Sequence, residues 1–110
     1  MRLSIIIPVY NERATITEVL ARVQAVDLKT EIVVVDDASN DGTTEWLKEW
    51  VTQQSEGVTL CHHKQNRGKG AAIRTGLQKI TGDYVIIQDG DLEYDPNDYV
   101  RLLTPLLNGQ

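Results

Sequence analysis

The sequence predicts an α/β fold, a Rossmann-like open parallel sheet built from alternating strand and helix units. Four short stretches rich in β-branched and apolar residues are typical of buried strands, and segments with helical spacing of apolar residues separate them. Strands that are apolar on both faces indicate a parallel sheet covered by helices. The carboxyl ends of such strands meet at one edge, which is where ligands bind in open α/β sheets.

The predicted elements alternate regularly along the chain. The four strands are expected over residues 2–10, 30–37, 57–63 and 82–88, and the helices over 11–26, within 38–54, over 71–80 and over 97–103. Asn11 is a favourable N-cap for the first helix, and Asp95 with Pro96 form an N-cap and N1 pair that opens the last one. Trp46 and Trp50 lie four residues apart and are expected to be core contacts of the second helix.

Length, charge and cysteine content limit the class of protein. A chain of 110 residues suits one small domain, so residues 1–110 are expected to form a single unit. The net charge of −5 argues against a nucleic-acid partner, because phosphate binding requires a clustered basic face. The longest apolar runs, IIIPV and IVVV, are too short to span a membrane. Cys61 is the only cysteine, so a disulfide framework is excluded and a cytoplasmic location fits.

An acidic segment begins where the fourth predicted strand ends. Asp89, Asp91, Glu93 and Asp95 follow one another at every second position. In an extended segment such neighbours lie about 6.6 Å apart and repel by about 0.6 kcal/mol in water, or about 2.5 kcal/mol at a dielectric constant of about 20. A bound cation would remove this cost, and hard oxygen ligands favour Mg²⁺ or Mn²⁺ over zinc. The alternative is a solvated acidic loop.

Two adjacent aspartates, Asp36 and Asp37, follow the second predicted strand. Neighbouring residues of a strand point to opposite sides, so one carboxylate can serve the fold while the other serves a ligand. A carboxylate at this position could accept hydrogen bonds from a ribose or from a base N–H group. The alternative is an ordinary turn, since the segment DDASNDGT is rich in turn-forming residues.

Two further motifs give weaker signals. The segment NRGKG opens the third helix with Arg67 and Lys69, and free N–H groups at a helix start beside cationic side chains suit a phosphate. Its alternative is a flexible connection, and the spacing is not that of a P-loop. The run Cys61-His62-His63 suggests a metal site, but adjacent strand residues point to opposite faces and zinc-ligand spacing is absent. These three are therefore expected to be ordinary residues of a strand end.

Four motifs together point to a known family. The chain contains, in this order, SIIIPVYNE, IVVVDDASNDGT, NRGKGAAIRTG and DGDLEYDP. It resembles the family-2 glycosyltransferases of the GT-A fold, and among them the dolichyl- or polyprenyl-phosphate sugar transferases. The resemblance covers nearly the whole chain. It implies an enzyme that transfers a hexose from a nucleotide diphosphate sugar, a UDP- or GDP-sugar, to a saccharide or to a polyprenyl-phosphate acceptor at the membrane surface.

The resemblance also implies roles for individual residues. The nucleotide-binding residues would be Pro8, Tyr10, Glu12, Val35, Asp37, Lys69, Asp89, Gly90 and Asp91. Asp89 and Asp91 would be the family's DxD pair, which holds Mg²⁺ or Mn²⁺ and the donor diphosphate. Glu93 would reach the same metal, at a position where the lipid-phosphate transferases often have Gln, and so departs from the family pattern.

The length of the chain is a second departure from that pattern. The family's catalytic domain is about twice the size of a small single domain such as this. The general base that deprotonates the acceptor is expected beyond Gln110, so no catalytic residue is assigned. We expect a truncated donor-binding half, which would expose a strand edge or apolar patch and form homo-oligomers. The alternative is a non-catalytic nucleotide-binding or assembly module that keeps the fold.

Overall fold

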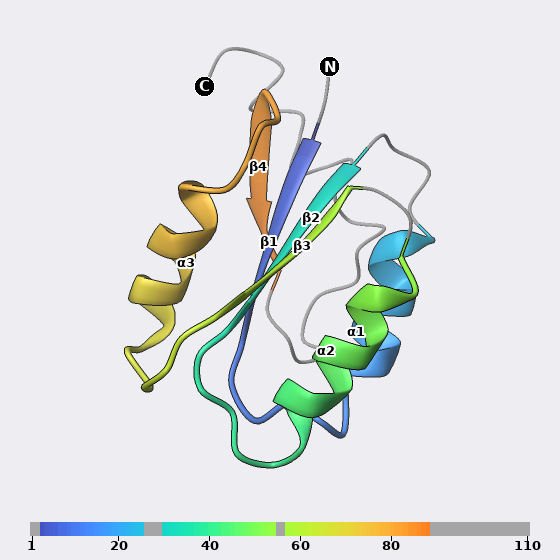
Figure 1. The fold of residues 1–110 in the computed structure, drawn as a ribbon. Helices are drawn as coiled ribbons and strands as arrows, with labels where there is room; N and C mark the ends of the chain where they lie inside the picture. Colours follow the sequence, from blue (N-terminus) through green and yellow to red (C-terminus); the bar gives the residue numbers. More distant parts are fainter. Residues whose placement is uncertain (1–2, 26–29, 55–56, 89–110) are drawn as a thin grey trace.

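The computed structural model describes residues 3–25, 30–54 and 57–88, and within them the chain forms one parallel sheet. The strands are β1 (Leu3–Val9), β2 (Thr30–Asp36), β3 (Val58–His62) and β4 (Tyr84–Ile87). Their spatial order is β3-β2-β1-β4, and every pair is parallel (Figure 1). The predicted α/β fold with an open parallel sheet is therefore confirmed.

Helices cover both faces of this sheet. The helices α1 (Ile16–Gln24) and α2 (Thr43–Thr52) lie on one face, and α3 (Lys69–Leu77) lies on the other (Figure 1). Alternation along the strands explains this arrangement, because successive side chains of a strand point to opposite faces. Ile5 and Ile7 of β1 belong to the larger core cluster with α1 and Leu47 of α2, whereas Val33 of β2 packs with Ala72 of α3.

The first helix begins later than its sequence pattern indicates. Thr15 is the N-cap of α1, so the prediction that Asn11 caps this helix is wrong. Asn11 instead has a left-handed backbone with φ of 53°. Its N–H donates to Ser39 Oγ at 2.9 Å and its Oδ1 accepts from the Asn40 N–H at 2.8 Å, so it ties the loop after β1 to the loop after β2.

The last predicted helix, with Asp95 and Pro96, lies outside the described residues.

The two tryptophans of α2 are placed as expected. Trp46 and Trp50 stack with ring centroids 6.2 Å apart, and both are half-buried against the larger core cluster. The guanidinium of Arg13 lies over the Trp46 ring, 5.3 Å from the ring centre.

A buried carboxylate closes the amino end of the sheet. Glu31, near the start of β2, is 6% exposed. Its Oε1 accepts from Ser4 Oγ at 2.8 Å and from the Thr81 N–H at 2.7 Å, and its Oε2 accepts from Thr81 Oγ1 at 3.1 Å. Ser4 Oγ in turn accepts from the Gly82 N–H at 3.0 Å. Glu31 therefore joins β1 and β2 to the segment that leads from α3 into β4.

Helix α3 packs tightly on β1 at Gly76. A Cβ atom added to Gly76 would lie 2.6 Å from Cγ2 of Ile6, whose side chain is fully buried. We expect Gly76→Ala to lower the free energy of unfolding by about 1–3 kcal/mol, because overpacking outweighs a helix-propensity gain of about 1 kcal/mol. Urea denaturation measures this change.

The matched control for this prediction lies in the same helix. A Cβ added to Gly70 would meet the terminal Nη1 of Arg74 at 3.5 Å, which is an ordinary contact with a flexible group. Gly70→Ala should therefore leave stability unchanged or slightly higher. Equal unfolding free energies for Gly76→Ala and Gly70→Ala would contradict the tight packing of α3 on β1.

Candidate functional site

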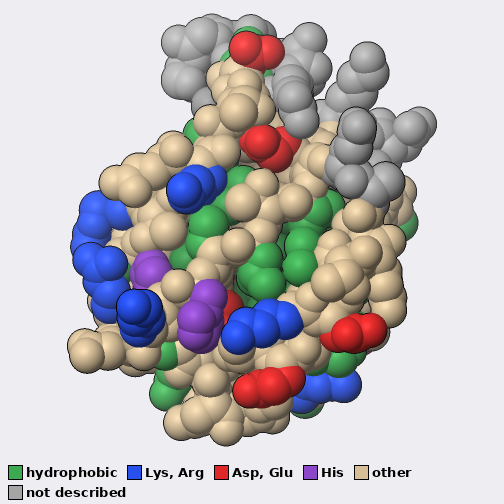
Figure 2. Space-filling view, in the orientation of Figure 1, with side chains coloured by type: hydrophobic (Ala, Val, Ile, Leu, Met, Phe, Trp, Pro, Cys, Tyr) green, Lys and Arg blue, Asp and Glu red, His purple; other side chains and the backbone are tan. Residues whose placement is uncertain are grey.

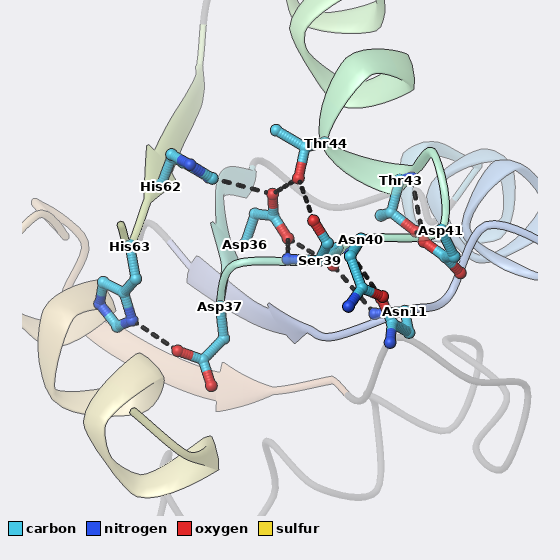
Figure 3. A network of polar contacts seen from close by, with 10 residues as sticks. All are labelled: Asn11, Asp36, Asp37, Ser39, Asn40, Asp41, Thr43, Thr44, His62 and His63. Carbon is cyan, nitrogen blue, oxygen red and sulfur yellow. Dashed lines mark hydrogen bonds and ion pairs between the residues drawn. The ribbon is translucent and has the colours of Figure 1, made fainter. Parts of the chain in front are cut away.

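The carboxyl ends of the strands bring three loops together at one edge of the sheet. The loops after β1, β2 and β3 meet around Asp36 and Asp37, which stand at the end of β2 (Figure 3). The two carboxylates contact different partners, as expected from strand alternation. Asp36 binds the loop that leads into α2, and Asp37 binds the loop that leads into α3.

Asp36 anchors the loop between β2 and α2. It is 1% exposed, and its Oδ1 accepts from the Ser39 N–H at 3.2 Å and from Ser39 Oγ at 2.6 Å. Its Oδ2 accepts from Thr44 Oγ1, at the start of α2, and lies 3.1 Å from Nδ1 of His62. Four polar groups thus converge on one buried carboxylate, which fixes the course of residues 36–44.

Asp37 anchors the loop between β3 and α3. It is 3% exposed, and its Oδ1 lies 2.8 Å from His63 Nδ1 and accepts from the Arg67 N–H at 2.9 Å. Its Oδ2 accepts from the Gly68 N–H at 2.8 Å. Burial acts to raise the pKa of Asp37, but the hydrogen bonds from His63, Arg67 and Gly68 lower it below its ordinary value of 3.8. Asp37 is therefore an ionised acceptor at neutral pH.

These contacts bear on the predicted phosphate site at the start of α3. Free N–H groups at this helix start were expected to suit a phosphate, and the N–H groups of Arg67 and Gly68, which precede the helix, donate to Asp37 instead. What the start of α3 presents to solvent is the exposed side chains of Arg67 and Lys69. Phosphate recognition at this loop would therefore depend on cationic side chains rather than on these two backbone groups.

Asp41, in the loop between β2 and α2, is the centre of a second group of hydrogen bonds. The Oδ1 of Asp41 accepts from the Thr43 N–H at 3.1 Å and from Thr43 Oγ1, and its Oδ2 accepts from the Arg13 N–H at 3.2 Å. Burial acts to raise the pKa of Asp41, but these hydrogen bonds lower it below its ordinary value. Together with the contacts between Asn11 and Asn40, Asp41 fastens the loop after β1 to the loop after β2.

The described nucleotide-binding candidates all lie at or near this edge. Pro8 and Val35 are buried register partners on β1 and β2. Tyr10, which is 44% exposed, and Glu12 follow β1, Asp37 directly follows β2, and Lys69 starts α3. The structure thus brings together at one edge residues from three of the four motifs.

The predicted metal ligands belong to the acidic segment 89–95. Asp89, Gly90, Asp91 and Glu93 lie outside the described residues. Within residues 3–25, 30–54 and 57–88, no three His, Cys, Asp or Glu side chains gather in a way that could hold a metal ion. The metal site at the acidic segment therefore stays a prediction.

Sequence reasoning missed the partnership of the two histidines with the two aspartates. Asp36 and His62 are register partners on β2 and β3, and His63 pairs with Asp37 one residue further on. Treating Cys61, His62 and His63 as ordinary strand-end residues left this out. Part of the signal is in the sequence, because the pairs DD and HH each end a predicted strand, but the register that joins them comes from the sheet.

A pocket of about 430 Å³ opens beside these pairs. It is lined by His62, His63, Lys64, Gln65 and Arg67. Lys64 and Arg67 are exposed, and Figure 2 shows the histidines beside Lys and Arg side chains on this side of the molecule. A lining of this kind can hold an anionic group through charge-assisted hydrogen bonds.

In the part of the chain that the structure describes, the helices lack the length and apolar character needed to cross a bilayer.

The amino-acid sequence of this chain is similar to those of known glycosyltransferases. Residues 4–110 match the family model described as Glycosyl transferase family 2. The chain is 34% identical over 110 residues to the undecaprenyl-phosphate 4-deoxy-4-formamido-L-arabinose transferase of Aeromonas hydrophila, which covers 96% of this chain and 34% of that protein. It is 33% identical over 111 residues to the dolichol-phosphate mannosyltransferase of Pyrococcus furiosus, which covers 99% of this chain and 31% of that protein.

A solved structure agrees with these sequence matches. The mannosyltransferase from Pyrobaculum calidifontis, in complex with GDP-Man and Mn²⁺, matches 94% of this chain and 32% of its own length, with a TM-score of 0.81 and 36% identity. The chain thus spans about a third of the length of these similar proteins.

Proposed function

The chain belongs to glycosyl transferase family 2, and on this premise we propose that its carboxyl edge binds a nucleotide diphosphate sugar. The observation that carries the proposal is the joining of three loops at that edge through Asp36, Asp37 and Asn11. These bonds tie together the loops that carry Tyr10, Glu12 and Lys69, at the carboxyl edge where open α/β sheets bind ligands.

Each residue has a physical role in this proposal. Tyr10 is exposed and offers an aromatic face for the base, and the buried register partners Pro8 and Val35 belong to the strand ends at the same edge. Asp37 contributes negative charge near the ribose or base and also fixes the loop that carries Lys69. Lys69 is exposed at the start of α3, and we assign its ammonium group to a phosphate of the donor.

We place a divalent cation at the acidic segment. Asp89 and Asp91, with Glu93, offer only carboxylate oxygens, a donor set that fits Mg²⁺ or Mn²⁺. Such a cation neutralises the charge of a departing diphosphate. Support comes from the similar Pyrobaculum mannosyltransferase, which was solved with GDP-Man and Mn²⁺.

For the whole protein we propose transfer of a hexose from a UDP- or GDP-sugar to a polyprenyl-phosphate or saccharide acceptor. The names of the similar undecaprenyl-phosphate and dolichol-phosphate transferases favour the lipid phosphate. A lipid acceptor would bring a cytoplasmic protein to the membrane surface. Homo-oligomerisation of this chain stays a prediction.

Calorimetric titration of UDP, GDP, CDP and dTDP with Mn²⁺ or Mg²⁺ tests the donor site. We expect metal-dependent binding of UDP or GDP, and we expect Asp91→Asn to weaken it at least about tenfold, or about 1.4 kcal/mol, because one ligand charge is lost. Glu49→Gln is the matched control, since Glu49 is an exposed carboxylate on α2 whose side chain takes no part in the site.

Two outcomes would contradict these assignments. Flat titrations with every nucleotide would overturn the donor site and favour an assembly module. Unchanged affinity in Asp91→Asn, with binding intact in the parent chain, would overturn the metal site alone.

A further inference from the structure

We propose that His63 is a positioning residue, which holds Asp37 in the orientation that fixes the backbone of Arg67 and Gly68 at the entrance to α3. This inference rests on the proposed function and deepens it, because the fixed loop carries the cationic side chains of the proposed nucleotide site. The proposed role of His63 depends on contacts within the chain, so it can be tested without any nucleotide.

The ring of His63 connects three elements of the fold. It follows β3 directly and is 7% exposed. Its Nδ1 lies 2.8 Å from Oδ1 of Asp37, at the end of β2, and its Nε2 lies 2.8 Å from Oγ1 of Thr75, on α3. Both nitrogens of a buried ring are therefore in hydrogen bonds, which leaves the ring one orientation (Figure 3 shows the contact with Asp37).

The chemistry of these partners sets the position of the ring proton. Asp37 is ionised and can only accept, so Nδ1 of His63 carries a hydrogen and donates it. In the neutral ring Nε2 then accepts from the Thr75 hydroxyl, and in the charged ring it donates to the same oxygen. The link between α3 and Asp37 is thus complete in either state of the ring.

The link between His63 and Asp37 affects the backbone of the loop between β3 and α3. The same Oδ1 that receives His63 also receives the Arg67 N–H at 2.9 Å, and the other oxygen receives the Gly68 N–H at 2.8 Å. Gly68 has φ of 94° and ψ of 162°, and an added Cβ there would meet nothing within 4 Å. A glycine is therefore required at position 68 because of the backbone conformation and not because of limited space. The Asp37 carboxylate holds that conformation through its bond to the Gly68 N–H.

A hydroxyl, an imidazole and a carboxylate in a row also occur in hydrolase triads. The pocket beside His63 is lined by His62, His63, Lys64, Gln65 and Arg67, and Thr75 is absent from that lining. A substrate in this pocket would meet the imidazole and the loop, not the hydroxyl. In addition, the carboxylate is shared with two backbone N–H groups. These observations favour positioning over nucleophilic catalysis.

Two substitutions of His63 separate the two ends of the link. The side-chain nitrogen of Asn can take the place of Nδ1, and that of Gln can take the place of Nε2. His63→Asn should therefore keep the contact with Asp37, whereas His63→Gln should keep only the contact with Thr75. Amide hydrogen exchange of Arg67 and Gly68, followed by NMR on the 110-residue chain, reports the loop directly.

We expect exchange at Arg67 and Gly68 to be about tenfold faster in His63→Gln than in the parent chain, and within about threefold of the parent in His63→Asn. Affinity for UDP or GDP should follow the same order, with His63→Gln about fivefold weaker. Equal exchange in the two variants would overturn the proposal. Binding of no nucleotide by the parent chain would overturn the proposed function, while the exchange data would still decide the role of His63.

A measurement on the unmodified chain covers the case in which a variant fails to fold. The ¹⁵N chemical shifts of the His63 ring distinguish a protonated from an unprotonated Nδ1. A protonated Nδ1 at neutral pH supports the link to Asp37, and an unprotonated Nδ1 overturns it.

Discussion

Replacing Asp36 by Ala is expected to lower the free energy of unfolding by about 3–5 kcal/mol. The substitution removes a carboxylate that is 1% exposed and leaves its partners without an acceptor, on Ser39, Thr44 and His62. Removing one partner of a buried charged contact carries a cost of that size, which is a large part of the about 5–15 kcal/mol by which a typical domain is stable. Urea denaturation followed by tryptophan fluorescence measures the change.

Asp41→Ala is the control for Asp36→Ala, because Asp41 lies in the same loop but is exposed. Asp41→Ala should lower the free energy of unfolding by only about 1 kcal/mol, because water can replace the contacts that the Asp41 side chain makes. Nucleotide affinity should fall strongly in Asp36→Ala, because the loop that meets Asn11 loses its anchor. Similar losses of stability in the two variants would show that Asp36 is not the anchor of this edge.

The second large effect is expected at the opposite end of the same strand. Glu31→Ala should lower the free energy of unfolding by about 3 kcal/mol, because Ser4 and Thr81 lose a buried acceptor. Glu31 stands five residues before Asp36, or about 16 Å along the strand. Nucleotide affinity, corrected for the folded fraction, should therefore stay the same.

Thr81→Val is the matched control for Glu31→Ala. It removes the hydroxyl contact with Glu31 Oε2 but keeps the Thr81 N–H contact with Oε1, so a loss of about 1 kcal/mol is expected. The pair Asp36→Ala and Glu31→Ala then separates stability from binding. An equal loss of nucleotide affinity in both would mean that binding depends on overall stability and not on the carboxyl edge.

The fold could be predicted because its strands are simple. Every residue of β1 is buried, and such a stretch reads as a strand between two layers of helices. The start of α1 was misplaced because the Asn11 side chain fits two roles. An Asn before a helical pattern suggests a cap, but here its amide binds across to the loop after β2, and sequence spacing does not reveal a partner 29 residues away.

The site was predicted less completely for a similar reason. The aspartates at the end of β2 were noticed, and so were the histidines at the end of β3, but as separate motifs. Their pairing depends on the register between β2 and β3, which only the assembled sheet supplies. The same register explains why Asp37, expected to face a ligand, also carries three hydrogen bonds within the chain.

The order of the strands has a consequence for the folding of the newly made chain. β1 lies between β2 and β4, and Leu3 is aligned with Thr30 on one side and with Tyr84 on the other. Synthesis delivers β2 soon after β1, but β4 comes 81 residues after Leu3, counted from 3 to 84. Contacts so distant in sequence form slowly, so β1 spends much of synthesis with one row of backbone groups unpaired. That row is the surface on which a strand of another nascent copy could add before β4 arrives.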